Sequence, residues 1–215
     1  MTAGLDEGLR HGLQVLGLDL EEGMVRQLLD YQALLQKWNK VYNLTAVREP
    51  AEMLTHHLLD SLAVVLPLRR QTRGRPSQLL DVGSGAGLPG VVIAICCPEL
   101  AVDCVDAVAK KAAFIQQVAV ALKLPNLRGL HRRVETLSNP YDIISSRAFA
   151  ALADFVTGSR DALAPQGVWM AMKGKLPEQE MSELPAGVEV FHVEQLSVPG
   201  LDADRCLVWL RRAPA

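Results

Sequence analysis

The sequence LLDVGSGAGLPG occupies residues 79–90. Its first part is an apolar run that ends in an acid and a valine, which is typical of a buried strand. A loop with a glycine at every second position follows, and glycine lets the backbone approach a ligand closely because it has no Cβ. We therefore predict a strand, a tight turn with a ligand site, and a helix after the turn.

The spacing of the glycines fits two kinds of cofactor. Gly83, Gly85 and Gly87, with Asp81 before them, look like the S-adenosylmethionine (SAM) loop of Rossmann-like methyltransferases. The pattern Gly85-x-Gly87-x-x-Gly90 instead fits the dinucleotide fingerprint of oxidoreductases. An acid in the position of Asp81 is usual in SAM enzymes, where it reaches the amino-acid end of the ligand or holds the loop. A dehydrogenase ordinarily has an apolar residue there.

Asp106 supports cofactor binding without deciding between the two cofactors. It follows the next predicted strand, about twenty residues after the loop, where both fold types place an acid on the ribose hydroxyls. Its alternative role is that of an N-cap for the following helix.

Length and composition predict one well-packed α/β domain with a small appendage, since the chain has 215 residues of which 49% are hydrophobic and 21% charged. No apolar run approaches the roughly 20 residues of a membrane span. Asp6, Glu7 and Arg10 interrupt the apolar stretch that a signal peptide would need. We expect a cytoplasmic protein without membrane contact, and a monomer, because nothing in the sequence indicates an obligate oligomer.

The chain divides near residue 75 into a helical region with a linker, residues 1–75, and a catalytic domain, residues 76–215. Apolar residues recur at spacings of three and four over 28–38, which predicts a helix. A second helix is expected from about Pro50 to a stop at Pro67. The segment 38–45 between them is rich in asparagine and aromatic residues and is predicted to interrupt the helix, and 69–77 is predicted to be the linker.

From residue 78 onward, predicted strands and helices alternate, which indicates a mostly parallel sheet. Helices are expected after the glycine loop, at about 110–123 and at 151–163. Only the turn-rich segment 197–204 separates the last two strands, which favours an antiparallel hairpin. A parallel sheet that ends in such a hairpin is typical of SAM-dependent methyltransferases, whereas a dinucleotide-binding half continues with a crossover helix. The predicted strands span residues 78–82, 101–105, 127–130, 141–145, 168–172, 188–195 and 205–209.

Metal and disulfide chemistry find little support. The four cysteines form no C-x-x-C pair and are expected to be small buried hydrophobic residues. His56 and Asp60 share one face of the second helix, but no third ligand is evident, so no metal site is predicted. The net charge of −2 gives no global attraction to nucleic acid, although local basic patches beside the sheet could still bind an anionic partner.

Six motifs occur in a fixed order along the chain. They are WNKVYNLT at 38–45, HLLDS at 57–61, DVGSGAGLPG at 81–90, RVE at 133–135, SRAF at 146–149 and KG at 173–174. Together they resemble the RsmG (GidB) family of bacterial small-subunit rRNA guanine-N7 methyltransferases, from about residue 25 to the C-terminus. The resemblance implies a class I, Rossmann-like SAM-dependent methyltransferase. It also implies methylation of one guanine N7 in the 530 loop of 16S rRNA, with 16S rRNA or the small ribosomal subunit as partner.

The resemblance implies cofactor contacts at Gly83, Leu88, Val134, Glu135 and Arg147. Asp81, Gly85, Gly87 and Asp106 complete the predicted cofactor site on the chemical grounds above. His57 and Asp60 are expected to join the helical region to the catalytic domain or to its RNA surface.

Guanine N7 carries a lone pair and no proton, so its attack on a sulfonium methyl needs no general base. Catalysis is expected to consist of alignment and exclusion of water. Arg147, Lys173 and Arg133 are the predicted positioning residues. Arg147 could hold guanine O6 or a phosphate, and Phe149 could stack on a base or belong to the core.

Two further functions remain open from the sequence. One is an NAD(P)-dependent oxidoreductase that uses the Gly85-x-Gly87-x-x-Gly90 pattern. The other is an RNA-binding protein without catalytic activity that keeps the methyltransferase fold.

Overall fold

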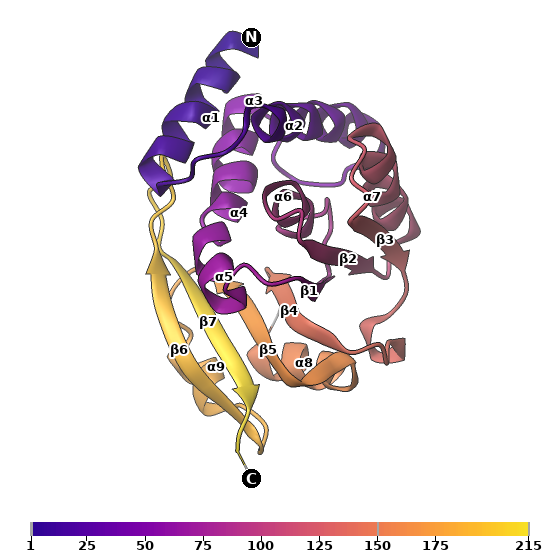
Figure 1. The fold of residues 1–215 in the computed structure, drawn as a ribbon, viewed down its shortest axis with the longest axis vertical. Helices are drawn as coiled ribbons and strands as arrows, with labels where there is room; N and C mark the ends of the chain where they lie inside the picture. The colour runs from indigo at the N-terminus through magenta and orange to yellow at the C-terminus, as the bar shows by residue number, and fades with distance from the viewer. Residues whose placement is uncertain (1, 150, 215) are drawn as a thin grey trace.

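Seven strands form one twisted sheet in the computed structural model, which describes residues 2–149 and 151–214 (Figure 1). The strands follow the order β3-β2-β1-β4-β5-β7-β6. The first five are parallel, while β7 is antiparallel to both β5 and β6. Their bounds are β1 Ser77–Val82, β2 Leu100–Asp106, β3 Leu127–His131, β4 Tyr141–Arg147, β5 Leu163–Lys173, β6 Val188–Leu196 and β7 Arg205–Arg212. The predicted mostly parallel sheet with a C-terminal antiparallel hairpin is confirmed.

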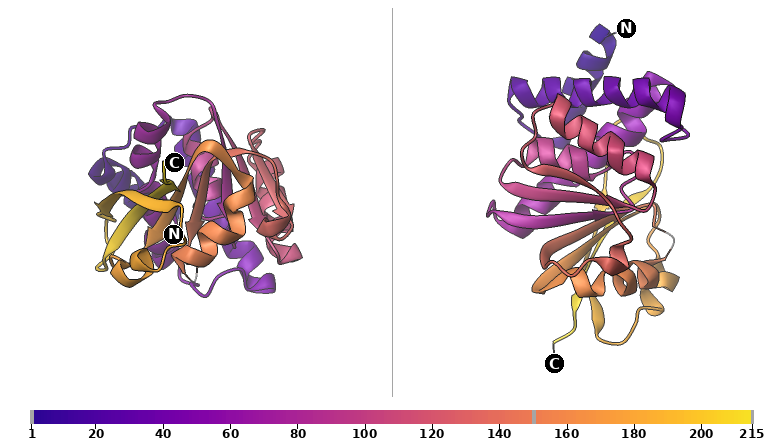
Figure 2. Two further views of the ribbon diagram at one scale, coloured as in Figure 1. Left: turned by 90° about the horizontal axis from the view of Figure 1, so that it is seen from below. Right: turned by 90° about the vertical axis from the view of Figure 1, so that its right-hand side faces the viewer.

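Helices cover both faces of this sheet (Figure 2). One face is covered by α1 (Thr2–Leu16), α2 (Glu22–Tyr42), α3 (Pro50–Met53), the π-helical turn η1 (Leu54–Leu59), α4 (Asp60–Leu62), α5 (Val65–Thr72), α6 (Gly90–Cys96) and α7 (Ala109–Ala121). The other face carries α8 (Leu152–Ser159), α9 (Glu178–Ser182) and the short 3₁₀ turns η2 (Val134–Thr136) and η3 (Arg160–Ala162). Among the described helices, none is both long and apolar enough to cross a membrane.

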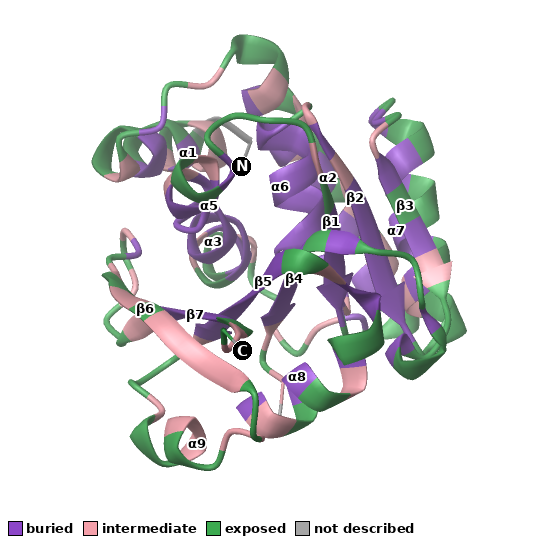
Figure 3. Cartoon of the chain, turned by 60° about the horizontal axis from the view of Figure 1, so that its bottom comes forward, coloured by how far each residue is buried: buried purple, intermediate pink, exposed green. Residues whose placement is uncertain are grey.

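The central strands are buried on both sides, as Figure 3 shows by their colour. Successive residues of β1 face opposite cores, because side chains alternate along a strand. Leu79 packs with the N-terminal helices, α6 and α7, and Leu80 packs with α8. Met170 and Trp169 of β5 repeat the same alternation. The apolar runs of the sequence therefore correspond to strands with two buried faces.

The N-terminal helices share one apolar core with α6 and α7. Leu9 of α1, Leu28 of α2 and Leu62 of α4 are fully buried in this core, together with Phe114 of α7. The division of the chain at residue 75 remains a prediction. All four cysteines are free and buried, which confirms the interpretation of their sequence pattern.

The structure corrects the prediction for residues 38–45, because α2 continues to Tyr42. Trp38 and Tyr42 lie one turn apart and their rings stack with centroids 5.0 Å apart. Asn39 is buried and its side chain is bonded to the backbone of Thr45 and Val47. Local packing thus outweighs the weak helix propensity of these residues.

The prediction that Pro67 ends a helix is also wrong. Pro67 lies in the first turn of α5, where its missing N–H needs no acceptor. Residues 63–64 form the break instead, and the helix continues through residues 69–72 of the predicted linker. The predicted helix at 151–163 is shorter than expected, since α8 ends at Ser159 and β5 already begins at Leu163.

Candidate functional site

The carboxyl ends of the parallel strands bring most of the predicted site residues to one edge of the sheet. Gly83 follows β1, Asp106 ends β2, Arg147 ends β4 and Lys173 ends β5. In open α/β sheets ligands bind outside this edge, where the connections diverge to opposite faces. This edge is therefore the candidate site.

The glycine loop has a backbone that favours glycine at three positions. Gly83, Gly85 and Gly87 have φ angles of 65°, 59° and 91°, in the region that side chains with a Cβ rarely adopt. Gly90 is needed for a different reason, because a Cβ there would overlap the Sγ atom of Cys104. The glycines thus serve both the shape of the loop and the close packing of α6 on β2.

The buried side chain of Asp81 supports the glycine loop through hydrogen bonds. Asp81 is fully buried, and its carboxylate accepts hydrogen bonds from the Ser145 hydroxyl, at 2.8 Å, and from the Gly90 backbone N–H, at 3.2 Å. The Ser84 hydroxyl donates to the backbone carbonyl of Asp81 at 2.7 Å. Burial raises the pKa of Asp81 to about 6, against the opposing effect of these hydrogen bonds. Of its two predicted roles, holding the loop is the one that these contacts display.

Asp106 also binds the loop. Its carboxylate accepts hydrogen bonds from the Gly85 N–H, at 3.0 Å, and from the Val108 N–H, at 2.8 Å, and Lys111 lies 3.7 Å away. A carboxylate has about four acceptor positions, so these contacts leave capacity for a ribose hydroxyl. Val108, not Asp106, is the N-cap residue of α7.

A hollow of about 180 Å³ opens beside the loop. It combines apolar walls with two acids and two arginines. Its lining residues are Val82, Gly83, Val105, Asp106, Ala107, Arg132, Arg133, Val134, Glu135 and Phe149. The space above Gly83 is free of backbone, since the nearest atom to a Cβ built there is Phe149 Cδ2 at 3.8 Å. An acid at the end of β2, an apolar–acid pair after β3 and an open glycine fit a nucleoside. We call this hollow the nucleoside hollow.

Five predicted cofactor residues do not line the nucleoside hollow. Asp81 is fully buried beneath the loop, and Arg147 lines a different hollow. Gly85 and Gly87 shape the loop, and Leu88 is buried in the apolar core beneath it with 3% of its surface exposed. Their geometry is that of residues that support the loop.

A second hollow, of about 380 Å³, lies at the ends of β4 and β5, against η1. It is lined by His56, His57, Asp60, Arg147, Ala148, Met172, Lys173, Gly174 and Arg205, and we call it the basic hollow. Arg147 and Lys173, two of the three predicted positioning residues, lie here together, whereas Arg133 lines the nucleoside hollow.

Ion pairs organise the basic hollow. Asp60, only 3% exposed, accepts from Arg147 Nη1 at 2.9 Å through one oxygen and from Arg205 Nε at 2.7 Å through the other. Arg147 Nη1 also donates to the His56 carbonyl at 2.9 Å. Lys173 pairs with Glu180 of α9 at 2.7 Å. Asp60 therefore links the N-terminal helices to β4 and β7 through two ion pairs. His57, for which the same role was predicted, has its side-chain hydrogen bond within the N-terminal region, to Thr45.

His57 lies in η1, and π-helical turns occur frequently at functional sites. Its Nε2 atom lies 2.8 Å from the Thr45 hydroxyl, while its Nδ1 atom is buried and has no partner in the part of the chain that the structure describes. Burial, helped by the positive charge of Arg147, lowers the pKa of His57 to about 4. The imidazole is accordingly neutral at pH 7.

Arg205 is the site residue that sequence reasoning missed. It begins β7, whose first pairs with β5 include Lys173 opposite Cys206. Because β7 is antiparallel, its first residue arrives at the edge where the parallel strands end. The sequence did indicate this position, because the last strand of the predicted antiparallel hairpin starts at residue 205.

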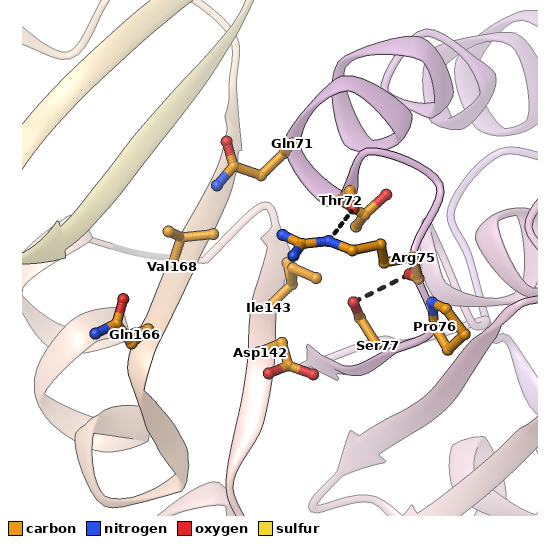
Figure 4. Close-up of a pocket in the computed structure, with 9 residues that line it drawn as sticks. All are labelled: Gln71, Thr72, Arg75, Pro76, Ser77, Asp142, Ile143, Gln166 and Val168. Carbon is orange, nitrogen blue, oxygen red and sulfur yellow. Dashed lines mark hydrogen bonds between the residues drawn. The ribbon is translucent and has the colours of Figure 1, made fainter.

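Another hollow, of about 340 Å³, lies at the opposite edge of the sheet, where β1 and β4 begin (Figure 4). Several of its polar groups are bonded within the chain. Arg75 Nε donates to the Thr72 carbonyl, the Ser77 hydroxyl donates to the Arg75 carbonyl, and Asp142 accepts from the Gln78 N–H. We assign no function to it.

Among residues 2–149 and 151–214, no group of three or more His, Cys, Asp or Glu side chains could hold a metal ion.

Comparison with known proteins adds the family to this geometry. The model of the family described as GidB, rRNA small subunit methyltransferase G, matches residues 24–208. The chain belongs to this family. A relative named ribosomal RNA small subunit methyltransferase G from Acidovorax ebreus is 66% identical and the match covers 98% of this chain and 96% of the relative. A relative of the same name from a Polaromonas species is 68% identical over 97% of this chain and 94% of its own.

Solved structures at low sequence identity share the fold of this rRNA small subunit methyltransferase G family member. TrmN from Thermus thermophilus superposes with a TM-score of 0.56 at 19% identity, over 74% of this chain and 53% of that one. Magnesium protoporphyrin IX methyltransferase from Synechocystis, solved with bound SAM, gives a TM-score of 0.59 at 13% identity, over 90% and 98%. The family match and the antiparallel β7, which a dinucleotide-binding sheet lacks, favour the methyltransferase interpretation of the glycine loop over the oxidoreductase one.

Proposed function

We propose that this chain is a cytoplasmic methyltransferase that transfers a methyl group from SAM to N7 of a guanine in the 530 loop of 16S rRNA. Membership of the rRNA small subunit methyltransferase G family gives the class of reaction. The observation that carries the proposal is the pairing of two hollows at one edge of the sheet, one suited to a nucleoside and one lined by arginine and lysine. We expect the enzyme to act as a monomer.

In this proposal the nucleoside hollow holds the cofactor. Gly83 offers open backbone, Asp106 accepts the ribose hydroxyls, and Val134 and Glu135 contact the adenine. Asp81, Gly85, Gly87 and Leu88 keep the loop in shape. When bound, SAM supplies a methyl group on a positively charged sulfur, which is the electrophile of the reaction.

The basic hollow receives the RNA in this proposal. Arg147 ends β4 next to β1, since Val82 pairs with Ser146, so its backbone lies beside the start of the glycine loop. Its guanidinium bonds to Asp60 and to the His56 carbonyl. Guanine N7 has a lone pair and carries no proton, so no residue has to act as a general base. His57 in the same hollow is a poor base, because burial lowers its pKa to about 4. Arg147 and Lys173 position the base and its phosphates, and the protein contributes alignment and exclusion of water.

Arg133 lines the nucleoside hollow and is largely exposed. We propose that it contacts RNA at the mouth of that hollow. Phe149 lies above Gly83, between the glycine loop and α8, and its ring centroid is 5.7 Å from that of Phe155. This position allows stacking on a base as well as packing against the core.

The test uses SAM with a tritiated methyl group and 16S rRNA, or small subunits, that lack the modification. We expect label in the RNA with the wild-type chain and none with Gly83→Asp, because the new carboxylate fills the open space of the nucleoside hollow. Absence of label with wild-type chain, when the same preparation binds SAM, would contradict the proposed acceptor. RNA binding without SAM binding would instead favour a protein that lacks catalytic activity.

A further inference from the structure

The basic hollow contains more positive charge than its buried acid neutralises. Asp60 carries one negative charge and faces two guanidinium groups, those of Arg147 and Arg205. Lys173 has its own partner in Glu180. The three residues Asp60, Arg147 and Arg205 therefore carry one surplus positive charge, in a place where only 21% and 24% of the two arginine side chains are exposed.

The two arginines also have unused donors. Arg147 makes its bonds to Asp60 and His56 through Nη1 alone. Arg205 uses Nε for Asp60 and Nη1 for the Asp204 carbonyl. Nε and Nη2 of Arg147 and Nη2 of Arg205 have no hydrogen-bond partner among the residues that the structure describes. A guanidinium carries five N–H donors in a planar fork, and its preferred partners are carboxylates and phosphates.

We propose that Asp60 is a positioning residue that holds Arg147 and Arg205 as one pair, and that the remaining donors of this pair bind one RNA phosphate near the target base. A phosphate carries the single negative charge that matches the surplus, whereas the neutral oxygen of a guanine would leave it uncompensated. The inference rests on the proposed function for the presence of RNA at this edge of the sheet.

The positions of the three residues make this arrangement depend on the whole fold. Asp60 follows η1 in the N-terminal helical region, Arg147 ends β4 and Arg205 begins β7. Each guanidinium bonds to a different oxygen of the one carboxylate, which fixes the two groups relative to each other. A buried carboxylate between them also reduces their mutual repulsion, so that both can face one ligand.

Replacement of Asp60 tests whether the two arginines bind RNA through their fixed positions or only through their positive charge. Asp60→Asn nearly keeps the side-chain volume and makes the hollow one unit more positive. If the arginines acted only through their charge, this variant would bind RNA more tightly. If Asp60 positions them, the variant binds RNA more weakly in spite of its added positive charge, by about tenfold, which is the usual effect of losing a charge-assisted hydrogen bond.

The experiment measures RNA affinity at several salt concentrations, the KM for RNA and kcat, and SAM affinity, in the full-length chain. Arg205→Gln is expected to raise the KM for RNA about tenfold. It should also reduce the slope of log affinity against log salt by about 0.7, the value for one phosphate on single-stranded RNA. Arg205→Lys keeps the charge and loses the fork, so it is expected to keep the slope and lose part of the affinity. SAM affinity should stay unchanged in the Arg205 variants and in folded Asp60→Asn. A loss of SAM affinity in folded Asp60→Asn would show that the free donors of Arg147 serve the cofactor, as the family resemblance implies, and would overturn the proposal.

Arg211→Gln is the matched control, since Arg211 lies on the same strand, at its other end, in an exposed ion pair with Glu189. The double variant Asp60→Asn/Arg205→Gln should bind RNA no more weakly than the weaker-binding of the two single variants. Either single change already breaks the pair of arginines held by Asp60, so the second change adds no further loss. Additive losses, tighter RNA binding by Asp60→Asn, or Arg205→Gln equal to Arg211→Gln would each overturn the proposal.

The experiments distinguish an error in the proposed phosphate contact from an error in the proposed function. If the wild-type chain transfers no methyl group to rRNA, the proposed reaction is wrong, while the salt slopes still test the phosphate contact directly. If Asp60→Asn loses SAM binding and its cooperative unfolding, it has failed to fold, and Arg205→Gln and Arg205→Lys then decide the question.

Discussion

The hydroxyl of Tyr31, in α2, donates a hydrogen bond of 2.8 Å to the backbone carbonyl of Ala86, in the middle of the glycine loop. Tyr31 is fully buried, and burial raises the pKa of its hydroxyl far above the ordinary value, so the group remains a donor. A residue of the N-terminal helices thus fixes the conformation of the loop that we propose for cofactor binding. The helical region is part of the site's support.

We expect Tyr31→Phe to weaken SAM binding and to lower the free energy of unfolding by about 1–2 kcal/mol, because a buried carbonyl loses its partner. Isothermal calorimetry with SAM and chemical denaturation measure the two effects. Tyr42→Phe is the control, since Tyr42 is on the same helix and 40% exposed. Equal behaviour of the two variants would show that the Tyr31 hydroxyl does not support the loop.

Gly90→Ala is expected to destabilise the protein by about 1–3 kcal/mol, the usual range for overpacking. The added Cβ would overlap Cys104 Sγ and lie 3.0 Å from Asp81 Oδ2. Removing the sulfur in the double variant Gly90→Ala/Cys104→Ala should restore part of the loss. Gly4→Ala, with open space around it, should be neutral or slightly stabilising in the same denaturation assay.

The buried Asp81 carboxyl makes a predictable contribution to the pH dependence of stability. Its pKa is raised from 3.8 to about 6 in the folded chain, so the folded state holds the proton more tightly than the unfolded state. Its stabilising contribution is full below pH 4, falls as the pH rises toward 6, and is absent above that. The change is on the order of 3 kcal/mol, at 1.36 kcal/mol per pKa unit.

Asp81→Asn cannot lose a proton and should lack this change. The difference in unfolding free energy, wild type minus variant, is therefore expected to fall between pH 4 and pH 6.5 and to be flat above. Urea titrations over this range measure it. A difference that rises with pH would mean that the hydrogen bonds from Ser145 and Gly90 outweigh burial.

Lys173→Gln is expected to lower kcat/KM for RNA about tenfold and leave SAM affinity unchanged. The loss has two parts, since the variant also leaves Glu180 without its cation. Lys173→Gln/Glu180→Gln should therefore recover part of the RNA affinity. Lys175→Gln, at an exposed lysine two residues away, is the control. If Lys175→Gln loses as much activity as Lys173→Gln, the basic hollow is not the place where RNA binds.

The sheet could be predicted because its determinants are local. Apolar runs such as that before Gly83 mark strands with two buried faces, and the turn-rich segment before Arg205 marks the hairpin. The same locality explains the errors. Residues 38–42 have weak helix propensity, and contacts with residues outside α2 keep them helical. Asn39 bonds to the nearby backbone of Thr45 and Val47, and Trp38 packs against the distant Phe114 of α7.

The site was predictable to the extent that strand ends reveal it. Asp106, Arg147 and Lys173 each follow the end of a predicted parallel strand by one or two residues, so the fold rule places them at one edge. The partners of these residues were not predictable, because ion pairs such as Asp60 with Arg205 join positions 145 residues apart. Nor does the sequence show which of two predicted roles Asp81 takes, since that depends on its distance from the Gly90 N–H.

The chemical identity of the methylated nucleoside tests the proposed reaction directly. Small subunits that lack the modification are incubated with the wild-type chain and isotopically labelled SAM, and the 16S rRNA is digested and analysed by mass spectrometry. We expect the label in 7-methylguanosine from the 530 loop with the wild-type chain, and none with Gly83→Asp. Label in any other nucleoside, or in 7-methylguanosine from another part of the RNA, would contradict the proposed reaction.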